Sequence, residues 1–368
     1  MRVSDPITIR GKVIKNRLTM APTVKFDYAG DDGKATEKHI EHYRDRARHE
    51  CGLICVEATA VSPGGRFCKG HMGLWSDDQI DGHRKIVDAC HEYGSVVIIQ
   101  LNHTGITSNP ECGPAIGPSA APTRNPEVFA REMTIDEIHE MQELFVKAAE
   151  RAKAAGYDGI QLHGCHGYLI NQFVSAQTNQ RTDEYGGSIE NRARFGSEII
   201  RMTRERCGDD FIISVRTTGI EPDIATAIAV SEEYVKAGCD YLQVSTGIEE
   251  WNDPTLFEEG EPYNLIVKLG VRFHEHFKGR VPVSCVNSLF EPEQVRYLIE
   301  NDLVDTVDLA RAVLADPAFC EAVLSDTPFV RCFDCPRCQY GPGMPHKCPA
   351  EMKRNELPTP ITSDGRGF

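Results

Sequence analysis

Short runs of apolar residues recur along the chain every few tens of residues, and a polar stretch of helical length follows most of them. Each run closes with small or polar residues, as expected for a strand buried on both faces that leads into an amphipathic helix. Eight strands are predicted in this way, at residues 17–22, 53–61, 96–103, 159–163, 211–217, 241–245, 281–286 and 306–310.

Helical periodicity is clearest between the second and fourth strands, over residues 80–93 and 134–155. In the longer segment, apolar residues fall three or four positions apart, and Thr134 or Asp136 can cap its start. Eight strand–helix units in about 330 residues predict a (β/α)8 TIM barrel. A doubly wound open sheet is the alternative, and the lack of Gly-x-Gly-x-x-Gly after the first strand counts against it.

The composition changes after the eighth unit. We expect residues 1–327 to form the barrel, residues 328–356 a Cys-rich appendage organised by its thiols, and residues 357–368 an extended tail. Of 14 cysteines, four lie in the appendage, as Cys332-x-x-Cys335-x-x-Cys338 and then Cys348. In a reducing compartment such clustering indicates a metal or cluster site rather than disulfides.

The charge balance narrows the classes of partner. The 368 residues include 40 Lys and Arg against 55 Asp and Glu, which gives a formal charge of −15. This charge disfavours nucleic acid and anionic membrane surfaces as partners. No apolar run approaches the roughly 18 residues of a membrane span, so we expect a cytoplasmic protein.

Polar residues follow several predicted strands, at the end where barrel enzymes bind their ligands. Gln100, His163, His166, Tyr168 and Arg216 all lie there. Gathering these groups at one mouth costs free energy unless a ligand forms hydrogen bonds with them. A planar polar ligand is therefore expected.

Five segments carry a family resemblance, in order along the chain: residues 16–22, 56–66, 100–103, 163–169 and 179–192. On these segments the chain resembles the Old Yellow Enzyme family of FMN-dependent ene-reductases, in the branch that includes the barrels of 2,4-dienoyl-CoA reductase and trimethylamine dehydrogenase. The resemblance implies FMN as cofactor, NAD(P)H or a separate electron-donor protein as reductant, and an α,β-unsaturated carbonyl compound as substrate. A homo-oligomer is a further expectation.

The resemblance also implies roles for the residues at the mouth. Gln100 would pair with the flavin pyrimidine ring, to which its amide offers a donor and an acceptor, and a Gln satisfied by backbone is the alternative. Arg216 would stabilise negative charge on the reduced flavin, with an internal salt bridge as the alternative. Further contacts with the flavin are expected at Ala21, Pro22, Thr23 and Ala58.

His163 and His166 offer two imidazole donors that can polarise a substrate carbonyl, and Tyr168 can deliver a proton. Two alternatives remain, a metal site that adds His103 and a pair of core histidines. By resemblance, the flavin phosphate would lie near Asn287, Ser288, Ala310 and Arg311. The family usually has a Gly-Gly pair and a Gly-Arg pair at these positions, so both turns depart from its pattern.

The cysteine quartet resembles the [4Fe-4S] site of 2,4-dienoyl-CoA reductase, with shorter gaps before the third and fourth cysteines. Because the spacing differs, a zinc ion held by four thiolates is the alternative. Glu249 stands where dienoyl-CoA reductases tend to carry a catalytic His, which argues against dienoyl-CoA as the substrate. Besides the ene-reductase, two functions remain open: a metal-dependent lyase or aldolase, and a non-catalytic flavin and iron–sulfur electron-transfer subunit.

Overall fold

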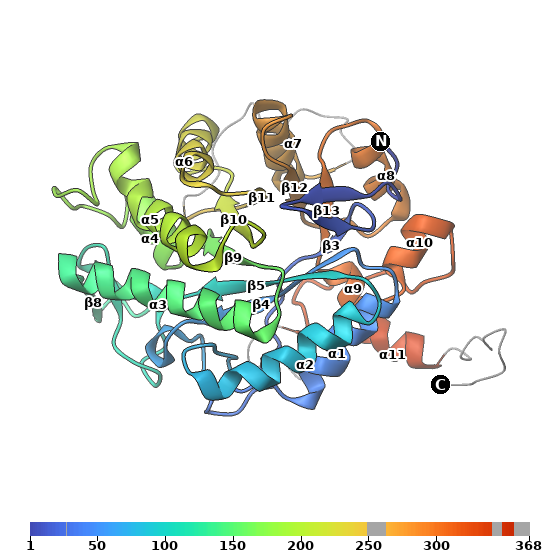
Figure 1. Cartoon of the computed structure of the whole chain (residues 1–368), viewed down its shortest axis with the longest axis horizontal. Coiled ribbons are helices and arrows are strands. Elements are labelled where there is room, and N and C mark those ends of the chain that lie inside the picture. Colours follow the sequence, from blue (N-terminus) through green and yellow to red (C-terminus); the bar gives the residue numbers. More distant parts are fainter. Residues whose placement is uncertain (27, 249–262, 341–347, 357–368) are drawn as a thin grey trace.

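The computed structural model describes residues 1–26, 28–248, 263–340 and 348–356, so Glu249 and the predicted tail at residues 357–368 lie outside the described residues. Eight strands close into a parallel barrel in the order β10-β11-β12-β13-β3-β4-β5-β9 (Figure 1). Their bounds are β3 Leu18–Met20, β4 Leu53–Ala60, β5 Val96–Asn102, β9 Gly159–Gly164, β10 Ile212–Thr218, β11 Tyr241–Ser245, β12 Val283–Val286 and β13 Thr306–Leu309. The TIM barrel prediction is confirmed, and the open-sheet alternative is wrong.

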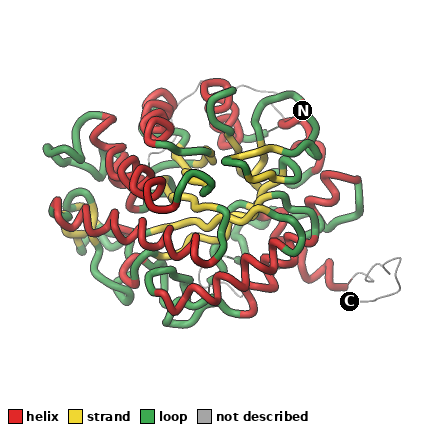
Figure 2. The backbone as a smooth tube through the Cα atoms, viewed as in Figure 1, coloured by secondary structure: helices red, strands yellow, loops and turns green. Residues whose placement is uncertain are grey.

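Helices surround the strands on the outside of the barrel (Figure 2). The longer ones are α1 Glu37–Arg48, α2 Ile80–His91, α3 Ile135–Ala155, α5 Ile189–Cys207, α6 Ile224–Ala237, α7 Leu265–Phe277, α8 Pro292–Glu300 and α10 Phe319–Ser325. Thr134, one of the two predicted caps, begins α3, and its side chain accepts a hydrogen bond from the Glu137 N–H. Among the described helices, none is both long enough and apolar enough to cross a lipid bilayer.

Several short elements interrupt the repeat, and their lengths are too small to show periodicity in the sequence. They are the strands β1 Ile7–Ile9, β2 Lys12–Ile14, β6 Ile116–Gly117, β7 Ala121–Pro122 and β8 Phe129–Glu132, and the helices α4 Leu169–Val174, α9 Arg311–Ala315 and α11 Pro349–Glu356. Two of them, α4 and α9, directly follow barrel strands at the carboxyl-terminal end. They shape the mouth of the barrel.

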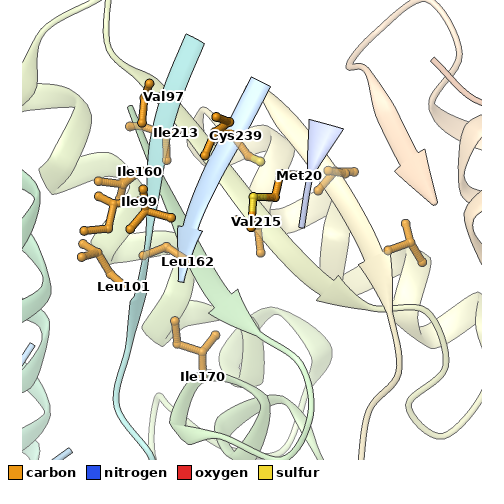
Figure 3. Packing of buried hydrophobic residues seen from close by; sticks show 14 of the residues in the cluster. Met20, Val97, Ile99, Leu101, Ile160, Leu162, Ile170, Ile213, Val215 and Cys239 are labelled. Atoms are coloured by element: carbon orange, nitrogen blue, oxygen red, sulfur yellow. The ribbon is translucent and has the colours of Figure 1, made fainter. Parts of the chain in front are cut away.

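Side chains alternate between the two faces of each strand, so the barrel has two distinct sets of buried contacts. On β5, the outward-facing Val97, Ile99 and Leu101 pack in the layer between strands and helices (Figure 3). Phe145 of α3 and Ile86 of α2 belong to the same buried cluster. This outer layer is the main hydrophobic core.

The inward-facing side chains form a smaller cluster at the bottom of the barrel. Leu53, Val96 and Ile212, near the starts of their strands, lie in one buried cluster with Ile9 and Ile14 of the β1–β2 hairpin. The hairpin therefore closes the amino-terminal end of the barrel with apolar side chains. Polar groups inside the barrel lie above this plug, toward the carboxyl-terminal end.

Candidate functional site

A cavity of about 230 Å³ opens at the carboxyl-terminal end of the barrel. Four strand ends contribute predicted site residues to its walls: His166, Arg216, Asn287, Ser288, Ala310 and Arg311. The fold therefore brings together residues that are far apart in the sequence. Histidine and arginine side chains and the predicted phosphate turns share one recess, as a barrel active site requires.

Gln100 lies inside the barrel on β5, opposite Gln161 of β9, and is 1 % exposed. Its side-chain amide donates to Gln161 Oε1 at 2.8 Å. The Gln100 amide is therefore held by another side chain rather than by backbone. No described residue donates to Gln100 Oε1, so this oxygen can accept a hydrogen bond from a ligand.

Arg216, on β10, is 7 % exposed and faces the cavity. No carboxylate of the described residues lies within 4.0 Å of its guanidinium, and its buried Nε has no hydrogen-bond partner among them. The alternative of a close internal salt bridge is thus not found in the described part of the chain. A buried cation without a close counterion favours an anionic ligand.

His163 and His166 are bonded to each other: His163 Nε2 lies 2.9 Å from His166 Nδ1, and His166 Nε2 lies 2.7 Å from the Ser245 hydroxyl. Burial, helped by His166 and Arg216, holds the pKa of His163 well below its usual value. His166 is solvent-accessible within the recess, and the desolvation there and the Arg216 charge lower its pKa. Both imidazoles are therefore neutral at pH 7, so each ring carries one N–H donor and one acceptor.

A metal at these histidines would draw on a different third ligand from the one expected. Among the described residues, the ligand atoms of His163, Cys165 and His166 lie within 4.8 Å of one another. His103 instead accepts the Gly105 N–H at Nδ1, at 3.1 Å. Burial raises the pKa of the Cys165 thiol to about 12, which disfavours the thiolate that a metal needs.

Tyr168 directly precedes α4, and its ring lies beside that of His163. Its ring centroid is 4.8 Å from that of His163 and 4.9 Å from that of Phe67. Side chains of α4 hold the preceding turn, because Gln172 donates to the Gly167 carbonyl at 2.6 Å and Asn171 accepts the Gly167 N–H at 2.9 Å. No described residue bonds the Tyr168 hydroxyl, which leaves it available for proton transfer.

The turns predicted to hold the phosphate keep a glycine-like backbone without glycine. Asn287 has φ 111° and Ser288 has φ 52°, in the region that Asn tolerates better than most residues. Arg311 donates from Nη2 to the Ser288 hydroxyl at 2.7 Å, and its guanidinium lies 4.8 Å from the Phe290 ring centroid. A hydroxyl and an oriented cation therefore stand at the ends of β12 and β13, as a phosphate group requires.

The mouth of the barrel contains polar atoms that lack partners within the protein, which tests whether a flavin fits. Buried atoms without a hydrogen-bond partner among the described residues belong to Thr23, Asn102, His163 and Arg216. Because buried polar atoms are almost always bonded in folded proteins, this set fits a polar ring such as the flavin. The remaining predicted contacts, Ala21, Pro22 and Ala58, follow β3 or lie on β4.

Two further residues of this region, Asn102 and Ser245, are at predicted strand ends but were given no role from the sequence, and Asp308 was missed. Asn102 lies two residues after Gln100, and that spacing places both side chains on one strand face. Ser245 and Asp308 line the cavity. Asp308 could have been found as a lone carboxylate within the apolar run of β13, a position at which charge is costly.

The Cys-rich segment packs against the barrel close to this site. Cys332 and Cys348 lie against a small buried cluster of Ala315, Val330 and Ala350. The segment is attached beside the end of β13 by an ion pair between Arg311 and Asp334. On the other side, the Lys25 ammonium lies 3.8 Å from the Tyr340 ring centroid. Four unpaired thiols are thus placed beside the mouth of the barrel.

Comparison with known proteins identifies the family. Residues 3–328 match the model of the NADH:flavin oxidoreductase / NADH oxidase family, a range that stops before the cysteine quartet. The NADPH dehydrogenase of Geobacillus sp. (strain WCH70) is 36% identical over 316 residues, which cover 85% of this chain and 91% of that protein. The family resemblance is confirmed over the barrel.

Solved structures of similar proteins support the same family assignment. The old yellow enzyme homologue from Zymomonas mobilis superposes with a TM-score of 0.76 at 27% identity, over 90% of this chain and 95% of that one. A 2-naphthoyl-CoA reductase in complex with 2-naphthoyl-CoA gives a TM-score of 0.81 at 26% identity, over 89% of this chain, which spans 52% of that larger protein. The lyase and the non-catalytic alternatives both lose support. This chain belongs to the NADH:flavin oxidoreductase / NADH oxidase family and is an FMN-dependent flavin oxidoreductase of the Old Yellow Enzyme type.

Proposed function

We propose that the chain is an ene-reductase that reduces the C=C bond of an α,β-unsaturated carbonyl compound. The observation that carries this proposal is the bonded pair of His163 and His166, with the Tyr168 ring against His163, beside the recess that Arg216 lines. Hydrogen-bond donors for a carbonyl and a proton donor for carbon are the two groups that alkene reduction needs from the protein.

Each group has a defined task. FMN, when bound, supplies hydride to the β-carbon of the substrate. His163 or His166 donates an N–H to the substrate carbonyl and so stabilises the negative charge that develops on its oxygen. Tyr168 gives its hydroxyl proton to the α-carbon and recovers a proton from water. For both rings to donate to one oxygen, the hydrogen bond between His163 and His166 must break.

Similar proteins support the reductant and the class of substrate. The similarity to an NADPH dehydrogenase supports NADPH as the source of electrons. The similarity to a reductase solved with 2-naphthoyl-CoA supports conjugated carbonyl compounds, thioesters among them. The proposed site residues are those that were given roles from the sequence, together with Asn102 and Ser245, which lie at two of the predicted strand ends.

The proposal is tested in the oxidative half-reaction. Protein reconstituted with FMN is reduced anaerobically and mixed with 2-cyclohexenone, and flavin absorbance is followed in a stopped-flow instrument. We expect the oxidised spectrum to return at a rate that saturates with enone concentration, while cyclohexanone, which lacks the C=C bond, has no effect. If neither simple enones nor unsaturated thioesters reoxidise the flavin, the ene-reductase proposal is wrong.

For the cysteine quartet we propose a [4Fe-4S] cluster. Among the described cysteines, no three sulfur atoms lie within 4.8 Å of one another. Four thiolates on a single zinc ion would be about 3.8 Å apart, given a Zn–S distance of about 2.3 Å. A cube-shaped cluster spaces its ligands more widely, because each thiolate binds a different iron atom. Its place beside Lys25 and Arg311 suits electron transfer to the flavin site.

Replacing Cys335 with alanine is expected to remove the cluster and leave the barrel folded. Anaerobically purified wild-type protein should contain about four iron and four sulfide ions per chain. The variant should lose both, together with the brown absorbance, and keep its FMN. Cys112→Ala is the matched control, since Cys112 is also partly buried but lies outside the segment. One zinc ion per wild-type chain without iron would favour the zinc alternative.

A further inference from the structure

A layer of polar side chains crosses the barrel between the apolar plug and the mouth. Gln100, Gln161 and Gln243 belong to it, one each on β5, β9 and β11, and Asp308 of β13 completes it. All four are at most 1 % exposed. Three amides and a carboxyl group in the interior of a barrel are costly to bury unless they satisfy one another.

These side chains form one continuous hydrogen-bonded chain with a single direction. Gln100 Nε2 donates to Gln161 Oε1 at 2.8 Å, Gln161 donates to Gln243 Oε1, and Gln243 Nε2 donates to Asp308 Oδ1 at 2.9 Å. Every amide turns its N–H group toward the carboxylate. The free end of the chain is the Gln100 oxygen, which points the opposite way.

Asp308 is held as an acceptor, and no cationic group in the described part of the chain lies within 4.0 Å of its carboxylate. Thr19 donates to its Oδ1 and Ser284 donates to its Oδ2 at 2.9 Å. The ionisable groups that act on it from the surrounding strands are Arg216 of β10, Tyr241 of β11, Cys55 of β4 and Cys285 of β12. Burial raises the pKa of Asp308 to about 6, and the hydroxyl donors and Arg216 oppose that rise.

We propose that Asp308 is a positioning residue that sets the reduction potential of the bound FMN, through the glutamine chain that ends at Gln100 and through the field it exerts at Arg216. The proposal rests on the proposed placement of the flavin between Gln100 and Arg216. An ionised Asp308 polarises the three amides and strengthens Gln100 Oε1 as an acceptor. It also offsets part of the positive field of Arg216, where the reduced flavin gains negative charge. The ionised form therefore disfavours reduction.

Asp308→Asn removes the charge with little change of shape. At pH 8 we expect the ratio of the affinity for reduced FMN to the affinity for oxidised FMN to be about tenfold higher in this variant than in the wild type. A tenfold change in this ratio raises the two-electron midpoint potential by about 30 mV. At pH 5.5 wild-type Asp308 is largely protonated, so the difference between the two proteins should shrink. The potentials are measured by spectroelectrochemical titration without any alkene substrate.

Asp305→Asn is the matched control, because Asp305 lies just before the same strand, at its opposite end. It should leave the potential at its wild-type value. A second measurement needs no variant: the wild-type potential plotted against pH should fall more steeply over about one pH unit just above the Asp308 pKa, and return to its former slope beyond it, because a tenfold coupling raises that pKa by about one unit when the flavin is reduced. Equal potentials for wild type and Asp308→Asn at pH 8, an equal shift in Asp305→Asn, or a wild-type plot without the steeper interval would overturn the inference.

These outcomes are separate from the test of the ene-reductase proposal. If no enone reoxidises the reduced flavin but Asp308→Asn shifts the midpoint potential, the proposed substrate class is refuted and the role of Asp308 is supported. If the protein reduces enones but Asp308→Asn leaves the midpoint potential unchanged, the ene-reductase proposal is supported and the role of Asp308 is refuted.

Discussion

Replacing Tyr168 with phenylalanine is expected to slow reoxidation of the reduced flavin by an enone about 10²- to 10³-fold. The variant loses the hydroxyl that is proposed to protonate the α-carbon but keeps the ring that packs against His163 and Phe67. Without that proton, negative charge remains on the substrate as hydride arrives. Stopped-flow measurement of the oxidative half-reaction gives the rate, and the reductive half-reaction with NADPH should stay within a few-fold of wild type.

The pH dependence of the same experiment is a second check on Tyr168 as the proton donor. Burial raises the pKa of Tyr168, so the hydroxyl stays protonated through neutral pH and the wild-type rate should be flat there. Tyr93→Phe is the control, because Tyr93 lies near the amino-terminal end of the barrel, where its carbonyl accepts a bond from Lys15. A Tyr168→Phe protein as fast as wild type would mean that water or another residue protonates the substrate.

Replacing Arg216 with methionine is expected to weaken binding of FMN about 100-fold. The methionine side chain fills similar space but offers no charge and no N–H donors. Because the buried Nε and the cavity-facing guanidinium have no close carboxylate among the described residues, the loss falls on the ligand and not on an internal ion pair. Affinity is measured by titrating apoprotein with FMN and following the quenching of flavin fluorescence.

A conservative variant separates charge from shape at this position. Arg216→Lys keeps the positive charge but loses the planar pair of donors, so it should bind FMN with intermediate affinity and retain most of the preference for the reduced form. Methionine should lose that preference, which appears as a more negative midpoint potential. Wild-type affinity and potential in Arg216→Met would place the flavin elsewhere in the mouth of the barrel.

The barrel was predictable because each parallel strand is buried on both faces and therefore requires a short run of apolar residues in the sequence. The start of α3 was predictable for a local reason, since the Thr134 side chain caps the helix within its own first turn. Residues such as Gln100 and Arg216 were found because strand ends in a barrel meet at one mouth. The β1–β2 hairpin was missed, because three-residue strands carry no period and Ile9 and Ile14 are explained only by the barrel end that they close.

Local patterning and strand polarity were enough to predict the eightfold repeat, the end of the barrel at which ligand-binding residues gather, and the types of residue found there. How those residues pair with one another became known from the folded barrel alone. The bond between His163 and His166, the ion pair of Arg311 with Asp334, and the chain from Gln100 to Asp308 join side chains whose partners depend on strand register and rotamer. A polar residue within a predicted buried strand indicates that a hydrogen-bond partner is needed, and the geometry of the closed barrel determines which residue that partner is.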